Sequence, residues 1–332
     1  MRALILAPFA EPWLRRLRER MDVTYESWLD TNRLHDPEEL GARLAREGVS
    51  ILVVEADFVF SEVFEAAPGL RVVGVCRNAL NHVDIGAATE HGVAVLHAPG
   101  RNTNAVAEMT IGLMLALGRM IVPAHALVSG GGWRDPATGY RSLRGREIAG
   151  STVGVIGFGR IGREVSRKCL ALGARVVAHD PIVPDDALRD DGAEPRGLNE
   201  LAREADFVTI HVPEHGSTRG LIGERFLGAM RRTAFLVNTS AGSVIDTGAL
   251  VRALEAGQIA GAALDVFEGQ PLPQTSELLS APNVLLTPHI AGATDETVER
   301  HSRMMVEDIE RYLAGQPMRH VINPEYAASR AG

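Results

Sequence analysis

Short apolar runs alternate with amphipathic stretches along the first 98 residues of the chain. Runs rich in Val, Ile, Leu and Ala predict buried strands at residues 3–7, 51–54, 72–76 and 93–96. Apolar residues at helical spacing predict helices at residues 13–20, 37–46 and 85–91. This alternation predicts an α/β unit with a parallel sheet. The unit has no glycine-rich turn of its own, which disfavours it as the nucleotide-binding part of the chain.

An apolar helical pattern follows at residues 102–119, with apolar side chains on almost all sides. Such a helix is typical of burial between domains or between subunits. Residues 129–149 are polar and rich in glycine, and they include Trp133 and Tyr140. We expect this segment to leave the compact body and either close over a site or pack on a second subunit. The sequence therefore predicts a homodimer.

A glycine turn stands between a predicted strand and a predicted helix in the middle of the chain. The apolar run 152–156 leads into Gly157-Phe158-Gly159-Arg160-Ile161-Gly162, and helical spacing of apolar residues then continues to Gly173. Gly157 permits the tight turn, Gly159 lets the backbone approach a pyrophosphate, and Gly162 lets the helix pack closely on the strand. The phosphates of a dinucleotide are expected at the positive end of this helix, beside Arg160 and Ile161.

Asp180 follows the next predicted strand, which spans residues 175–178. An acidic residue there accepts hydrogen bonds from the adenosine ribose hydroxyls and repels a 2′-phosphate. The next residue is Pro181 rather than an arginine. The sequence therefore predicts NAD, rather than NADP, as the cofactor.

Strands and helices alternate again after Asp180. The predicted strands span residues 206–211, 234–237, 261–264 and 284–286, and the predicted helices span 224–230, 247–255 and 294–313. The expected fold class is α/β, with two doubly wound parallel sheets. Ligands gather at the carboxyl ends of such strands. The residues at those ends are Asp180, His211-Val212-Pro213, Asn238-Thr239-Ser240, Asp265 and Pro288-His289.

Length and charge narrow the range of partners. The 332 residues suffice for two domains, and the net charge of −8 leaves no broad basic field. Nucleic acid and anionic membrane are therefore disfavoured, and a small-molecule substrate is expected.

The N-terminal apolar run is too short for a signal peptide or a membrane span, and Cys76 and Cys169 lie outside any C-x-x-C pattern. We expect a cytoplasmic protein.

Several motifs, in order, resemble those of the D-isomer-specific 2-hydroxyacid dehydrogenase family. They are APGRNTNAVAE, TVGVIGFGRIG, HVP followed by TRGLI, VNTSAGSVID, AALDVF and TPHIAGAT, and the resemblance covers residues 70 to about 325. It implies a flavodoxin-like substrate domain made of residues 1–98 and 290–332, with an NAD domain of residues 99–289 inserted into it. It also implies a homodimer that interconverts 2-keto acids and D-2-hydroxy acids with NAD.

The resemblance implies three catalytic residues, of which only one is matched. His289 occupies the histidine position, Ala241 the arginine position and Gln270 the glutamate position; Glu268 is acidic but stands two residues too early. Gln270 can orient an imidazole by a hydrogen bond but brings no charge that favours the imidazolium. The further cofactor contacts implied by the resemblance are His211, Val212, Pro213, Thr239, Asp265 and His289. Asp265 could instead only cap the turn after its strand.

Without an arginine at Ala241, the substrate carboxylate needs another cation. Arg77 follows a predicted strand, and Arg101 lies in the crossover between domains, so these two residues with Asn78 and Asn102 are the substrate candidates. Arg101 is the leading candidate for the anion contact, although both arginines could simply face solvent. No metal is expected, because Pro213 separates His211 from His215. Two other functions remain open: an NAD-binding redox sensor or partner protein, and an oxidoreductase for a substrate without a carboxylate.

Overall fold

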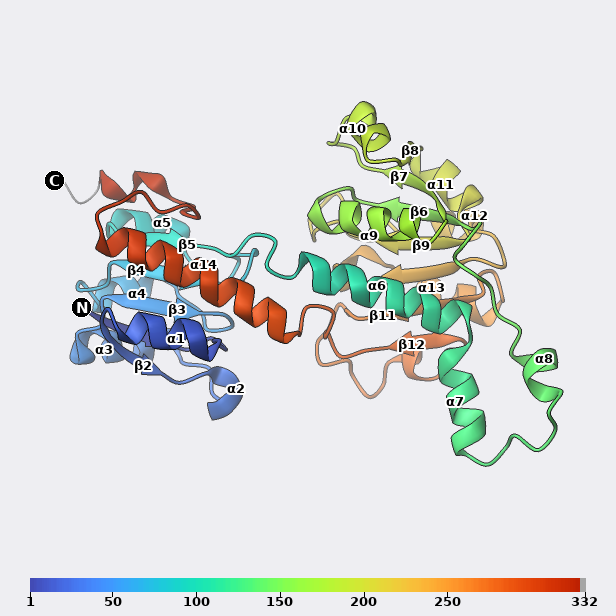
Figure 1. The fold of residues 1–332 in the computed structure, drawn as a ribbon, viewed down its shortest axis with the longest axis horizontal. Helices are drawn as coiled ribbons and strands as arrows, with labels where there is room; N and C mark the ends of the chain where they lie inside the picture. The colour runs from blue at the N-terminus through green and yellow to red at the C-terminus, as the bar shows by residue number, and fades with distance from the viewer. Residues whose placement is uncertain (329–332) are drawn as a thin grey trace. The chain divides into compact units, whose positions relative to one another are not determined.

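The computed structural model describes residues 1–328. The chain forms two compact units (Figure 1). Unit 1 contains residues 1–101 and the segment that begins at Thr294, and unit 2 contains residues 102–293. Unit 2 is thus an insertion between two segments of unit 1. The predicted fold class, α/β with two doubly wound parallel sheets, is confirmed.

Unit 1 is built on a parallel sheet in the order β2-β1-β3-β4-β5. Its strands are β1 (Arg2–Ile5), β2 (Asp22–Tyr25), β3 (Ile51–Val54), β4 (Val72–Val75) and β5 (Ala94–Leu96). Its helices are α1 (Glu11–Arg18), α2 (Trp28–Thr31), α3 (Pro37–Glu47), α4 (Ser61–Ala66), α5 (Ile85–Glu90), α14 (Asp295–Leu313) and the 3₁₀ turn η3 (Pro324–Ala327). This flavodoxin-like strand order reverses direction between β1 and β3, so a ligand crevice is expected at the carboxyl ends of these strands.

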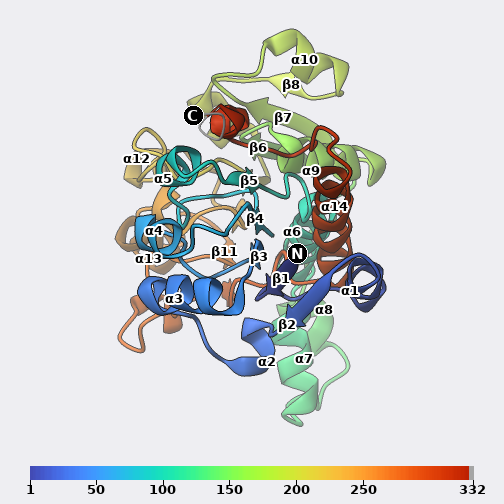
Figure 2. The same ribbon diagram turned by 90° about the vertical axis from the view of Figure 1, so that its left-hand side faces the viewer.

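Helices cover both faces of the unit 1 sheet. Figure 2 shows α1 and α14 on one face and α3, α4 and α5 on the other. Successive strand residues point to opposite faces, so Leu4 packs in one core and Ile5 in the other. Both side chains are fully buried. The strand ends are thereby fixed between two packed layers.

Unit 2 contains a seven-stranded parallel sheet in the order β12-β11-β10-β9-β6-β7-β8. Its strands are β6 (Thr152–Ile156), β7 (Arg175–His179), β8 (Glu194–Pro195), β9 (Phe207–Ile210), β10 (Phe235–Asn238), β11 (Gly261–Leu264) and β12 (Val284–Leu286). Its helices are α6 (Thr103–Gly118), α7 (Ile121–Ser129), α8 (Thr138–Ser142), α9 (Arg160–Ala171), α10 (Asp185–Asp190), α11 (Leu198–Glu204), α12 (Glu224–Ala229) and α13 (Thr247–Glu255), with 3₁₀ turns η1 (Gly242–Val244) and η2 (Glu277–Leu279). The strand order reverses between β6 and β9, which marks the ligand crevice of a dinucleotide-binding sheet.

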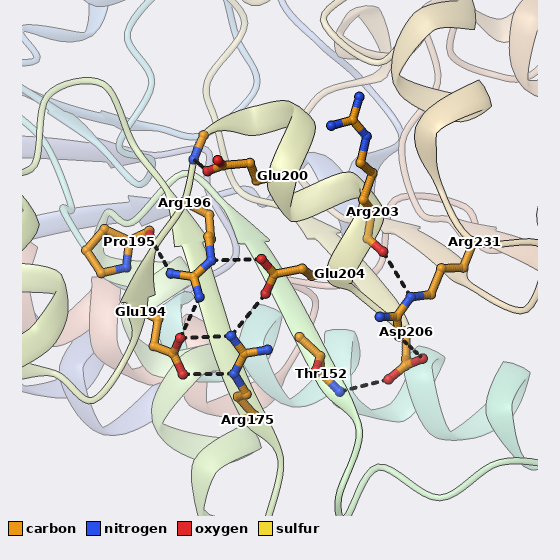
Figure 3. Close-up of polar contacts among 11 residues, drawn as sticks. Thr152, Arg175, Glu194, Pro195, Arg196, Glu200, Arg203, Glu204, Asp206 and Arg231 are labelled. Carbon is orange, nitrogen blue, oxygen red and sulfur yellow. Dashed lines mark hydrogen bonds and ion pairs between the residues drawn. The ribbon is translucent and has the colours of Figure 1, made fainter.

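Ion pairs hold β7 and β8 in place at one edge of this sheet (Figure 3). Arg175 donates two hydrogen bonds of 2.8 Å to Glu194 and a third of 3.0 Å to Glu204. Arg196 bonds the same two carboxylates at 2.7 and 2.9 Å. The Arg175 guanidinium lowers the pKa of Glu194 to about 2. The network joins β7, β8 and α11 and so supports the strand that ends just before Asp180.

A buried carboxylate joins the last part of the excursion to the start of β9. Asp206 accepts hydrogen bonds from Arg146, from Arg231 at 3.1 Å and from the Thr152 backbone N–H at 2.9 Å. The contact with Thr152 links Asp206 to the first residue of β6, as Figure 3 shows. These bonds attach Arg146 and the first residue of β6 to the start of β9, and β6 leads directly into the glycine turn.

Sequence patterns missed several elements. Those not predicted are β2, β8, α2, α4, α7, α8, α10 and α11. The β2 sequence DVTY is polar and no residue in it is fully buried, so it lacks the apolar signal of an inner strand. The predicted excursion at 129–149 begins earlier, because α7 already leaves the sheet. No residue of α7 is buried.

The predicted apolar helix at 102–119 is α6, and it packs within its own unit. Its buried residues, which include Leu113 and Met114, join the core beneath α9. Apolar surface that could pack on a second subunit is found instead on α7, where Ile121 and Val128 are exposed. No single helix in residues 1–328 is long and apolar enough to cross a membrane; α6 and α7 reach that length only as a pair bent by 61°.

Candidate functional site

The glycine turn after β6 has the geometry that a dinucleotide requires. Gly157 has a φ of +90°, and a Cβ there would lie 2.7 Å from the His211 carbonyl. A Cβ on Gly162 would lie 2.0 Å from the Gly157 oxygen, so only glycine allows this packing. At Gly159 a Cβ would meet no atom within 4 Å, and the N-terminus of α9 has no side-chain cap. Open space next to uncapped N–H groups fits a pyrophosphate.

Asp180 is built into the same turn. Its Oδ2 accepts a 2.7 Å bond from the Phe158 N–H, and its Oδ1 accepts bonds from the N–H groups of Ile182 and Val183 at 2.8 and 3.0 Å. Partial burial raises the pKa of Asp180, but the three N–H donors outweigh that effect and hold the pKa below its usual value. The carboxylate is therefore ionised and fixed beside the glycine turn, as ribose recognition requires.

His289 and Gln270 meet as the sequence predicts. The His289 Nδ1 lies 2.7 Å from the Gln270 Oε1, and the Gln270 Nε2 donates to the Phe267 carbonyl at 3.2 Å. Because the amide N–H is engaged with Phe267, the amide oxygen faces the imidazole, and the His289 Nδ1 must carry a proton. The Nε2 atom is then left for proton exchange. Both residues are exposed.

A buried carboxylate shapes the loop that carries His289. Asp265 is fully buried after β11, and its Oδ1 accepts from the Thr287 hydroxyl at 2.6 Å and from the Ile290 N–H at 2.9 Å. Its Oδ2 accepts from the Ala291 N–H at 2.8 Å. Within this loop His289 has a φ of +55°, a conformation that is uncommon for residues other than glycine. Asp265 therefore positions His289 through the backbone on either side of it.

Comparisons with known proteins agree with this geometry. Residues 111–291 match the model of the D-isomer specific 2-hydroxyacid dehydrogenase, NAD binding domain. The chain is 38% identical over 323 residues to a glyoxylate reductase of Thermofilum pendens, an alignment that covers 95% of this chain and 92% of that protein. This chain belongs to the D-isomer-specific 2-hydroxyacid dehydrogenase family.

Solved structures place this dehydrogenase in the same fold. The apo-structure of D-lactate dehydrogenase from Escherichia coli has a TM-score of 0.81 at 26% identity, covering 97% of this chain and 100% of the other. A glyoxylate reductase from Paecilomyes thermophila has a TM-score of 0.79 at 27% identity, covering 98% of each chain. The protein is thus an NAD-dependent oxidoreductase of the D-2-hydroxyacid dehydrogenase type, and the predicted family, activity class and cofactor are confirmed.

The dehydrogenase has a small side chain where the resemblance implies an arginine. Ala241 is half-buried, and its carbonyl accepts a 2.8 Å bond from the buried Asn238 side chain. A Cβ on Gly242 would lie 2.0 Å from the Phe267 carbonyl carbon, so the turn packs closely on the Gln270 segment. Glu268 does not contact His289; its carboxylate accepts a 2.6 Å bond from Arg219. Gln270, not Glu268, is therefore the partner of His289.

The remaining predicted cofactor residues line the strand ends of unit 2. The hydroxyl oxygen of Thr239 lies 3.0 Å from the hydroxyl oxygen of Thr110. A Cβ on Gly157 would lie 2.8 Å from the Val212 side chain. The Pro213 carbonyl accepts a 2.7 Å bond from Thr218. At α9, Arg160 is exposed and Ile161 is half-buried.

The two histidines of the H-x-x-x-H pattern have separate contacts. His211 Nε2 lies 2.9 Å from the Thr209 hydroxyl, and burial of the ring lowers the pKa of His211 to about 3. His215 is exposed, and its Nδ1 lies 3.0 Å from the Ser217 hydroxyl. Within residues 1–328 no group of three or more His, Cys, Asp or Glu residues is arranged to hold a metal ion.

Three of the four substrate candidates are Asn102, Arg77 and Asn78, and their surroundings are as follows. Asn102 precedes α6 in unit 2, and its side chain lies beside Gly292, where a Cβ would come within 3.0 Å of the amide nitrogen. Arg77 and Asn78 are exposed in the turn after β4 of unit 1.

Sequence patterns gave no signal for the role of Asp265 in the His289 loop, because its donors lie more than twenty residues further along the chain.

Substitution of Asp180 tests the basis of cofactor selection. We expect Asp180→Ala to weaken NAD binding about tenfold or more, because it removes a charge-assisted acceptor for the ribose hydroxyls. NADP binding should weaken less or improve, because the repulsion of its 2′-phosphate is lost. Calorimetric titration of both cofactors measures the two affinities, with Asp185→Ala on α10 as an exposed acidic control. Wild-type protein that bound NADP as tightly as NAD would contradict the prediction.

Proposed function

We propose that His289 of this dehydrogenase is the acid–base residue in the interconversion of a 2-keto acid and a D-2-hydroxy acid. The hydrogen bond between His289 and Gln270 carries the proposal, because it fixes the tautomer that leaves Nε2 for the substrate oxygen. The glycine turn and Asp180 would hold the cofactor, which would supply the hydride as NADH in reduction and accept it as NAD⁺ in oxidation. His289 then donates a proton to the carbonyl oxygen in reduction, or removes one from the hydroxyl in oxidation.

Gln270 acts on this proton transfer only as an orienting partner. A carboxylate in its place would stabilise the imidazolium, whereas the neutral amide accepts one hydrogen bond and adds no charge. Reduction needs the protonated ring and oxidation the neutral ring. The Gln270 side chain therefore orients the His289 ring without adding a charge that would favour its protonated form.

Turnover with a panel of 2-keto acids and NADH, followed at 340 nm, tests the proposed function. Glyoxylate belongs in the panel because the similar protein of Thermofilum pendens is named a glyoxylate reductase. Oxidation of NADH with at least one acid supports the proposal and excludes the redox-sensor alternative. NADH binding without turnover of any acid would favour that alternative, and turnover of neutral aldehydes or ketones alone would favour a substrate without a carboxylate.

The two compact units also suggest separate roles. We infer that the substrate domain comprises residues 1–98 and 290–332, and that residues 99–289 form the NAD domain. The glycine turn, Asp180 and the His289 loop support the second assignment. We further infer a cytoplasmic enzyme without nucleic-acid or membrane partners, for which the net charge of −8 and the two free buried cysteines, Cys76 and Cys169, are the support.

We propose a homodimer formed through α7 and the excursion after it. Ile121, Val122 and Val128 on α7 and Trp133 beyond it are exposed by 48–56%. A cavity of about 460 Å³ lies between α7 and α8 and is lined in part by Val128, Trp133 and Tyr140. Apolar surface of this extent, projecting from the body of unit 2, is typical of a subunit interface.

Light scattering at micromolar concentration tests the dimer. We expect a dimeric mass for the wild type and a shift toward monomer for Val128→Glu, because a buried charge without a partner opposes association. Leu279→Glu is the matched control, since Leu279 is equally exposed at 56% but lies in η2. A monomeric wild type, or equal effects of both substitutions, would contradict the proposed interface.

A further inference from the structure

Arg101, the leading candidate for the anion contact, is already paired within unit 1. Its guanidinium lies 2.7 Å from the Glu55 Oε1 and 2.8 Å from the His301 Nδ1, and the side chain is only 13% exposed. The His301 Nε2 lies 2.7 Å from the Pro8 carbonyl and donates to it, so Nδ1 accepts from Arg101. The charge of Arg101 is therefore matched by Glu55, and the cations of unit 1 that can receive an anion lie elsewhere.

A groove with four arginine side chains lies between α1 and the carboxyl end of α14. Both helices cover the same face of the unit 1 sheet, as Figure 2 shows. The groove has a volume of about 640 Å³. Its charged lining residues are Arg16 and Arg20 from α1 and the turn after it, Glu307, Glu310 and Arg311 from α14, and Arg319 from the segment that follows. Four guanidinium groups thus face two carboxylates, in a chain whose net charge is −8.

Arg16 forms the fixed base of this groove. It donates to both oxygens of Glu310, from Nε at 2.9 Å and from Nη2 at 2.5 Å. Its guanidinium carbon lies 5.2 Å from the centre of the Trp13 ring. The hydrogen bond with Arg16 holds the pKa of Glu310 below its usual value, so Glu310 is ionised. The negative charge of Glu310 is therefore already matched by Arg16.

Among residues 1–328, the Arg20 and Arg319 side chains have only long ion pairs. The Arg20 Nε lies 3.8 Å from the Glu310 Oε1, and the Arg319 Nη1 lies 3.7 Å from the Glu307 Oε2. Both distances exceed the length of a hydrogen bond. Side chains that are 63% and 62% exposed gain little from such pairs, so both guanidinium groups can turn toward a ligand.

Arg311 is held in place by the backbone rather than by a carboxylate. Its Nε donates to the Pro317 carbonyl at 2.5 Å, and neither Nη atom bonds an acceptor among the residues that the structure describes. The residue is half-buried, so its guanidinium has lost part of its hydration. A fixed and partly desolvated guanidinium fits two oxygens of a phosphate or carboxylate and loses little conformational entropy on binding them.

We propose that the groove between α1 and α14 binds a small anion with two or more negative charges, either a phosphate ester or a polycarboxylate. Arg311 is the central contact, and Arg20 and Arg319 add two further guanidinium groups. The two surplus positive charges of the lining match the charge of such a ligand. The site lies wholly within unit 1 and is independent of the redox reaction. Its occupant holds together the N-terminal and C-terminal segments from which unit 1 is built.

Calorimetric titration of the NADH-loaded protein tests this site, because NADH keeps phosphate probes out of the glycine turn. The probes are inorganic pyrophosphate and citrate, and the one that binds more tightly identifies the class of anion. We expect Arg311→Met to weaken its binding about ten- to a hundredfold, the loss of one charge-assisted contact, and Arg20→Met to weaken it less. Arg303→Met is the control, because Arg303 is exposed on α14, lies outside the groove and has no ion pair among the described residues.

Thermal unfolding and hydrogen exchange give a second readout. The bound probe should raise the unfolding temperature and slow amide exchange in the last turns of α14, in the wild type and in Arg303→Met but not in Arg311→Met. If Arg311→Met does not fold, Arg20→Met and Arg319→Met provide the same comparison. A wild type that binds neither probe with a Kd below about 1 mM overturns the proposal, as does equal binding by Arg311→Met and Arg303→Met. Either result leaves the proposed function intact, because that function is tested by turnover.

Discussion

His289→Asn is expected to lower kcat by about 10²- to 10⁴-fold, the usual contribution of a positioned general acid or base. Asparagine can still donate an amide N–H to the Gln270 oxygen, but it has no nitrogen that exchanges a proton near neutral pH. The affinity for NADH should change little, since the glycine turn and Asp180 are untouched. Stopped-flow or steady-state absorbance at 340 nm measures kcat, and fluorescence titration measures NADH binding.

His215→Asn serves as the control for this substitution. His215 is exposed in the same unit and contacts only nearby residues, so its replacement should leave kcat within about twofold, the usual range for a surface site. Gln270→Glu adds a second readout, because a carboxylate beside His289 stabilises the imidazolium. The pH at which the rate of reduction falls should therefore move upward. A His289→Asn enzyme with wild-type kcat would refute the assignment of the acid–base residue.

Asp265→Ala is expected to reduce both stability and turnover. The change removes a buried acceptor of three hydrogen bonds and leaves the N–H groups of Ile290 and Ala291 unpaired. A cost of about 3–5 kcal/mol follows from the loss of charge-assisted bonds and the unpaired donors. Because His289 lies between the two freed N–H groups and Thr287, kcat should fall while KM for NADH changes less.

Thermal unfolding and steady-state kinetics separate these effects. Asp246→Ala is the matched control, because Asp246 accepts a single backbone bond of 2.9 Å at the start of α13 and its loss costs about 1 kcal/mol. Asp265→Asn should be intermediate, since the amide keeps one acceptor oxygen but turns an N–H group toward another donor. If Asp265→Ala lowers stability no more than Asp246→Ala and leaves kcat intact, Asp265 does not organise the His289 loop.

The cofactor site could be predicted from the sequence because its residues lie close together in the chain. The turn from Gly157 to Gly162 and the carboxylate of Asp180 lie within one strand–helix–strand unit, and their conformations follow from short-range sterics and hydrogen bonds. The pairing of Gln270 with His289 was accessible only through the family motifs. It joins two loops that the sheet topology brings together, and no pattern of apolar residues reports such a contact.

The role of Arg101 was beyond sequence reasoning for a physical reason. Its partner His301 lies 200 residues away in the chain, and its ion pair with Glu55 depends on the order of the strands. A sequence shows that a cation is present but not whether a carboxylate already neutralises it. The same limit applies to α7, whose apolar residues resemble those of a core helix but are exposed.

Within residues 1–328, the chain passes between its two compact units twice, near residues 101 and 294. The glycine turn, Asp180, Asp265, Gln270 and His289 all fall between these crossings. Two junctions therefore suffice to build a chimaera in which unit 1 of a relative is joined to unit 2 of this protein. Such a chimaera would keep the glycine turn, Asp180 and the His289–Gln270 pair of this protein together in one exchanged piece.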